Sequence, residues 1–168
     1  MGLKTRIKTA TIRRVGWVLF LVYLAGLVYF MFFAESLGRT ESSGGYRYNL
    51  EPFLEIRRCI LYWDVLGPLN AGLNLFGNVA AFMPFGFILP MLRLSNRRWY
   101  VIVLWSFLCS LSIETLQLVS MRGSFDVDDL MLNTLGGFLG YLCFLAAASL
   151  RRRLHEVQEE IRRLKLHD

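Results

Sequence analysis

The sequence predicts an all-α integral membrane protein, a bundle of four helices that cross the bilayer. Hydrophobic residues make up 55% of its 168 residues, and most of them fall in four runs that are almost free of charge. Each run is long enough to cross the hydrocarbon core as a helix, which takes about 20 residues. A soluble chain of this length could not hide four such helices from water. The predicted spans are residues 15–34, 69–92, 99–120 and 130–150.

The first span follows a basic segment, residues 1–14, that contains five Lys or Arg and no acidic residue. A secretory signal peptide would also begin with basic residues, but its apolar part is shorter, about 7–15 residues, and it ends at a small-residue cleavage site. The first run matches neither feature, so we expect it to be retained as a span.

The remaining basic residues set the predicted orientation. Three lie in residues 93–98 and six in residues 151–168, on the same side as the N-terminus. The loops on the other side hold five: Arg39, Arg47, Arg57, Arg58 and Arg122. By the positive-inside rule both termini are cytoplasmic. The chain then divides into a basic cytoplasmic N-terminus (1–14), a four-span domain (15–150) and a charged cytoplasmic helical tail (151–168).

The longest loop, residues 35–68, is therefore expected to face outward. It contains the Gly/Ser-rich stretch ESSGGY and continues as YNLEPFLEIRRCILYW. The second stretch is aromatic and amphipathic, a composition typical of segments that settle at the membrane interface. We expect it to lie partly along the outer interface.

The second span carries asparagines on one face of its outer half. Asn70, Asn74 and Asn78 recur every fourth residue, which places them on one side of a helix. Pro84 cannot donate a hydrogen bond to Ala80. A kink at this point would open space just below the asparagines.

The third span contains Glu114, the one charged residue inside the four predicted spans. A lone carboxylate in a membrane helix costs several kcal/mol unless it is protonated or partnered. Ser106, Ser110 and Gln117 follow the same face of the helix, so this span also has a polar stripe in its outer half.

The fourth span begins beside Asp126 and Asp129 and contains Asn133. Gly136 and Gly140 continue the same face, where small residues allow helices to pack closely. Beyond residue 150 the apolar residues recur at spacings of four and three through residue 164. Two interpretations stay open: the helix runs on into the cytoplasm along lipid headgroups, or its heptads form a homo-oligomer.

Three spans thus offer polar residues at about the same outer depth, which predicts a polar cleft open to the outside. A structural alternative is that Asp126 caps the fourth helix, that the helix dipole favours Asp128 and Asp129, and that Asn78 and Asn133 join helices. We expect no metal site, no cofactor and no nucleic-acid partner. The candidate ligand-binding residues are Asn78, Gln117, Arg122, Asp126, Asp129 and Asn133, with Glu114 as the acid or base if the protein is an enzyme.

Several stretches resemble the VanZ family: NVAAFMPFGFILP (78–90), SIETLQ (112–117), NTLGGFLG (133–140) and the preceding YNLEPFLEI (48–56). The resemblance implies a small multi-pass protein of the bacterial cytoplasmic membrane, in a family linked to resistance to teicoplanin-type glycopeptides. The family's polar motif positions fall on all seven candidate residues.

Three functions fit these features. The first is a non-catalytic envelope protein whose cleft binds a membrane lipid or lipid-linked wall precursor and so lowers susceptibility to the drug. The second is an enzyme that acts on such a lipid, with Glu114 as acid or base and Arg122 holding a phosphate. The third is a small proton-coupled transporter that uses Glu114.

Overall fold

The computed structural model describes residues 3–37, 46–92, 97–121 and 123–164, and most of them are helical. Four helices are long and apolar enough to cross a membrane, as predicted: residues 14–32, 68–92, 99–119 and 127–164. Many of their apolar side chains point outward; Leu19, Val22 and Leu104 are each more than half exposed. An apolar exterior of this kind suits lipid rather than water, and the chain is a multi-pass membrane protein.

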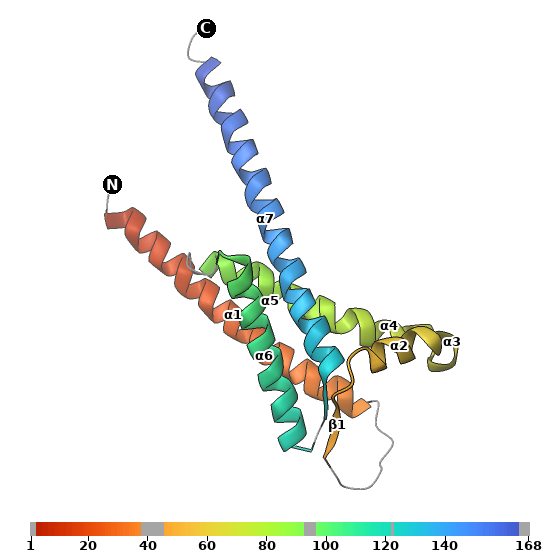
Figure 1. Ribbon diagram of the computed structural model, residues 1–168. Coiled ribbons are helices and arrows are strands. Elements are labelled where there is room, and N and C mark those ends of the chain that lie inside the picture. The colour runs from red at the N-terminus through yellow and green to blue at the C-terminus, as the bar shows by residue number, and fades with distance from the viewer. Residues whose placement is uncertain (1–2, 38–45, 93–96, 122, 165–168) are drawn as a thin grey trace.

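The described residues form a series of helices and two short strands (Figure 1). In order they are α1 (Leu3–Leu37), β1 (Arg47–Asn49), α2 (Leu54–Leu61), α3 (Trp63–Leu66), α4 (Pro68–Gly72), the π-helix η1 (Leu73–Gly77), α5 (Asn78–Leu92), α6 (Trp99–Val119), β2 (Ser124–Asp126) and α7 (Val127–Leu164).

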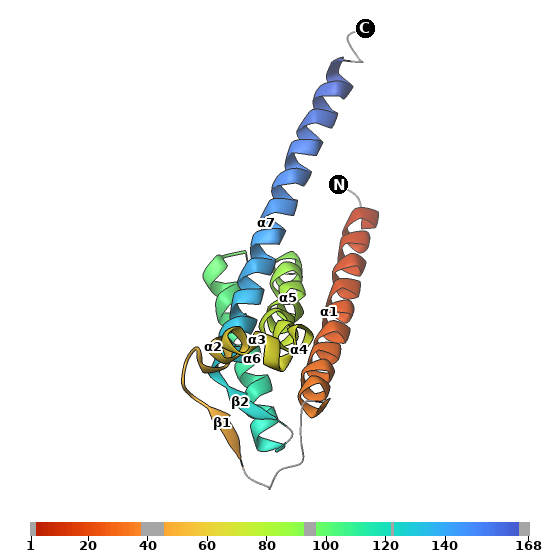
Figure 2. The ribbon, with the colours of Figure 1, turned by 90° about the vertical axis from the view of Figure 1, so that its right-hand side faces the viewer.

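The long helices α1, α6 and α7 run along the bundle, whereas α4, η1 and α5 cross it at a steep tilt (Figure 1). The start of α1 and the end of α7 lie at one end of the bundle, and β1 and β2 lie at the opposite end (Figures 1 and 2). The short helices α2 and α3 lie beside α4, across the side of the bundle.

The prediction of an exclusively helical chain was incomplete. Strands β1 and β2 pair in parallel, with Tyr48 opposite Phe125 and Asn49 opposite Asp126. Each strand has only three residues, too few for the alternating apolar pattern that identifies a strand in a sequence. The pair joins the segment before α2 to the start of α7.

Helices α5 and α7 pack closely against each other, and glycine makes this contact possible. A Cβ atom added to Gly86 would collide with the backbone carbonyl of Gly137, and one added to Gly140 would collide with that of Met83. The predicted close packing at Gly136 and Gly140 is therefore confirmed, with α5 as the partner helix. Around this contact an apolar core joins α1, α5, α6 and α7 through Phe20, Phe82, Phe85, Ile102 and Tyr141.

The fourth span and residues 151–164 of the charged tail form one uninterrupted helix, α7, of 38 residues. The far end of α7 stands clear of the other helices (Figure 1), and every side chain from 151 to 164 is exposed. The helical tail is thus confirmed, while its pairing with a second copy stays a prediction.

Candidate functional site

A polar cleft of about 200 Å³ lies where α2, η1, β1, β2 and the start of α7 meet. It is on the strand-bearing part of the molecule, away from the start of α1 and the end of α7 (Figure 1). Its charged lining residues are Arg47, Glu55, Arg58, Asp126, Asp128 and Asp129. Among the described residues, the cleft therefore combines two guanidinium groups with four carboxylates.

Asp128 fastens α2 to α7. Its carboxylate accepts hydrogen bonds from the backbone N–H groups of Phe53 at 2.5 Å, Glu55 at 2.8 Å and Ile56 at 3.1 Å. Phe53 has a left-handed backbone (φ 66°), and its own side chain makes no capping bond to α2. Asp128, which is 0% exposed, supplies that cap from another helix. The sequence predicts that Asp128 is favoured by the dipole of its own helix, and that prediction does not include this contact with α2.

Asp126 caps α7, as the structural alternative predicted. One carboxylate oxygen accepts the backbone N–H of Asp128 at 2.8 Å. The amide of Asn49 donates to both oxygens of Asp126, at 3.2 and 3.4 Å. Burial raises the pKa of Asp126 above its usual range, and these donors only partly offset that shift. The YNLEPF segment is thereby bonded to the beginning of the fourth span.

Glu114 of α6 contacts the backbone just before the start of α7 from outside the cleft. Its side chain is 1% exposed, and Oε2 accepts the backbone N–H of Asp126 at 3.0 Å. It is not one of the described residues that line the cleft. This hydrogen bond indicates that Glu114 holds the β2–α7 turn, which carries Asp126 and Asp128, in position.

Polar side chains join the second and fourth spans. The Asn78 side-chain amide donates a hydrogen bond to Asp129, which lines the cleft. Asn74, one turn earlier on the same face, also lines it. Of these two asparagines, Asn74 lines the cleft, and Asn78 contacts it only through Asp129.

The remaining candidates lie elsewhere. Asn133 is fully buried and donates to the hydroxyl of Ser110 at 2.9 Å, which joins α7 to α6. Gln117 donates to the backbone carbonyl of Met31 at 3.3 Å, which joins α6 to α1. Arg122 lies outside the described residues. Asn133 and Gln117 are therefore helix-joining contacts and do not line the cleft.

Two cleft arginines and one glutamate were not among the predicted site residues. Arg47 comes from β1, and Arg58 comes from α2, where its guanidinium contacts Glu55 at 3.0 Å. The amphipathic character of the LEIRRCIL stretch was the available signal. Its place at the outer interface stays a prediction, and nothing in the sequence shows that α2 also docks on α7.

The cleft has the chemistry for a charged headgroup. Arginine binds phosphate and carboxylate through paired N–H donors, and carboxylates accept from ammonium or hydroxyl groups. Within the described residues there is no group of three or more His, Cys, Asp or Glu placed to hold a metal ion.

One comparison with known proteins gives a match. A family model described as VanZ/LLP1 matches residues 20–149, which include most of the first span, the second and third spans, the fourth span almost up to the tail, and every described residue of the cleft. No curated protein and no solved structure matches the chain.

Proposed function

The chain belongs to the VanZ/LLP1 family, and from that premise we propose that it is a bacterial cell-envelope protein whose outer cleft binds the headgroup of an envelope lipid or lipid-linked wall precursor. Binding there changes what a teicoplanin-type glycopeptide can reach, and so lowers susceptibility to it. The observation that carries the proposal is the cleft itself, where Arg47 and Arg58 line the same space as Asp126 and Asp129, beside helices with an apolar exterior.

The binding function is favoured over catalysis by the position of Glu114. A general acid or base must come within hydrogen-bond reach of the reacting group. Glu114 is 1% exposed and already accepts the amide of Asp126. In this proposal it is a positioning residue that holds the cleft wall in place.

The proposal requires the cleft to face outward and both termini to be cytoplasmic. We expect a cysteine introduced at Leu50, which is 64% exposed beside β1, to react with a membrane-impermeant thiol reagent in intact cells. A cysteine introduced at Glu160 in the tail should react only after the cells are permeabilised. The native cysteines are replaced by alanine in both variants. The reverse labelling pattern would invert the topology and remove the outward cleft.

Arg58 and Arg57 provide a matched pair for testing the cleft. Both are exposed on α2, but only Arg58 is among the lining residues. Arg58→Gln should weaken binding of a short-chain polyprenyl diphosphate to the purified protein about tenfold, because one charge-assisted contact is lost. In a glycopeptide-sensitive host it should bring teicoplanin susceptibility back towards that of cells without the protein.

Arg57→Gln is the control, since it removes the same charge from the neighbouring position. It should bind the diphosphate and protect cells as the unaltered protein does. The exposed Arg58–Glu55 pair contributes little to stability, so Arg58→Gln should remain folded. Equal loss in the two variants, or protection by neither the variants nor the unaltered protein, would contradict the proposed role of the cleft.

A further inference from the structure

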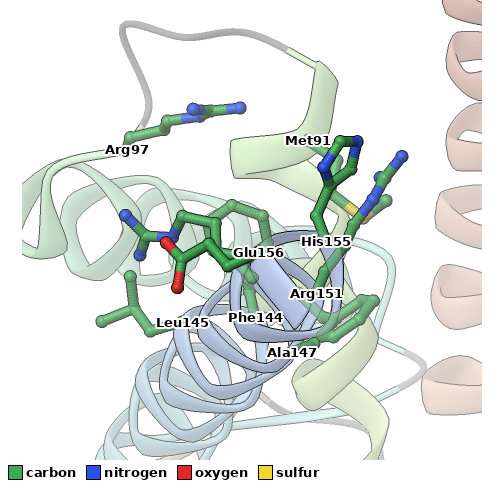
Figure 3. Close-up of a pocket in the computed structure, with 11 residues that line it drawn as sticks. Met91, Arg97, Phe144, Leu145, Ala147, Arg151, His155 and Glu156 are labelled. Carbon is green, nitrogen blue, oxygen red and sulfur yellow. The ribbon is translucent and has the colours of Figure 1, made fainter. Parts of the chain in front are cut away.

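A second cavity lies at the other end of the bundle, where α7 leaves the remaining helices. It measures about 800 Å³, within the range of small-molecule sites. Its walls come from the end of α5, the residue stretch just before α6, and one side of α7 (Figure 3). None of its lining residues takes part in the outer cleft.

The cavity is apolar on one side and cationic on the other. Its apolar part is formed by Phe87 and Met91 of α5 and by Phe144, Leu145 and Ala148 of α7. Its cationic part is formed by Arg97, Arg151 and Arg152, with His155 and Glu156 beside them. The arginines stand where the apolar sequence of α7 gives way to its charged tail, so the polarity changes at the predicted level of the lipid headgroups.

Several contacts hold these walls in place. The Tyr141 hydroxyl of α7 donates to the backbone carbonyl of Arg97 at 2.6 Å. The Arg97 guanidinium lies 6.0 Å from the centre of the Phe144 ring, and Phe87 meets that ring edge-on at 6.4 Å. These contacts hold Arg97 and the Phe87 and Phe144 rings in position without a bound ligand.

We propose that this cavity binds one anionic phospholipid from the leaflet at this end of the bundle. Arg97, Arg151 and Arg152 receive its phosphate, and an acyl chain lies against Phe87, Phe144 and Leu145. Charge complementarity supports a single anionic lipid, because three arginines outnumber the one acidic residue among the described lining residues. The apolar wall favours a lipid over a soluble phosphate, which would leave that surface exposed to water.

The test uses the full-length protein, stripped of lipid in a mild detergent, and native mass spectrometry to count bound lipid. Titration with phosphatidylglycerol should fill one site at concentrations at which phosphatidylcholine leaves it empty. Arg151→Gln/Arg152→Gln should weaken that site roughly tenfold or more. Arg162→Gln/Arg163→Gln removes the same charge from exposed positions farther along α7 and should leave the affinity unchanged.

Each alternative result overturns the proposal. Equal weakening in the two double variants would indicate diffuse attraction of lipid to the tail. Unchanged binding in Arg151→Gln/Arg152→Gln would remove the cavity from the interaction. Displacement of phosphatidylglycerol by glycerol 3-phosphate would identify a site for soluble phosphate compounds. Size-exclusion profiles of the variants confirm that each one is folded, and failure of the outer cleft to bind a precursor would not affect this result.

Discussion

Gly86→Ala is expected to destabilise the folded bundle by about 3 kcal/mol or more. The added Cβ would collide with the carbonyl group of Gly137 in the backbone of α7. A backbone carbonyl cannot rotate away as a side chain can, so α5 and α7 would have to separate. That separation would loosen the apolar core that both helices share. Thermal unfolding of the purified protein and its yield in a monodisperse form provide the measurement.

Gly26→Ala is the matched control. It adds the same methyl group to a glycine inside α1, where the new Cβ would meet nothing within 4 Å. It should leave the melting temperature unchanged or raise it slightly, because alanine favours helix more than glycine does. Equal melting temperatures for Gly86→Ala and Gly26→Ala would show that α5 and α7 do not depend on their close approach.

Asp128→Ala is expected to release α2 from the bundle. Three backbone N–H groups lose their acceptor, at a cost of about 3–5 kcal/mol if they stay buried. Because α2 is a short helix with no other described side-chain cap, we expect it to undock locally while the long helices remain assembled. The cleft would lose the wall that carries Glu55 and Arg58.

Cys59 reports this undocking. Its side chain is 1% exposed in α2, and burial raises the pKa of its thiol, so it should react slowly in the unaltered protein. In a background with Cys109 and Cys143 replaced by alanine, Asp128→Ala should speed its labelling by about tenfold or more. Asp64→Ala removes an exposed carboxylate from neighbouring α3 and should not. Slow labelling in both variants would mean that Asp128 does not hold α2.

Much of the candidate site followed from local patterns. The carboxylates Asp126 and Asp129 and the asparagine Asn78 were predicted from their spacing; Asp126 and Asp129 line one cleft, and Asn78 donates a hydrogen bond to Asp129. The capping role of Asp126 was also visible, because a helix cap and its amide lie only two residues apart. For Asn133 and Gln117 the pattern located buried polar side chains, but their partners are other helices.

The sequence by itself determined the four spans, the polar stripes and the glycine face of α7. These follow from hydrophobicity and from the period of a helix, which depend on neighbours along the chain. Only the tertiary structure decided which groups meet. Asp128 bonds to amides 72–75 residues away, β1 finds β2, and Glu114 reaches the amide of Asp126. Backbone amides are the same at every residue, so no sequence pattern marks the one that a distant carboxylate will accept; helix packing selects it.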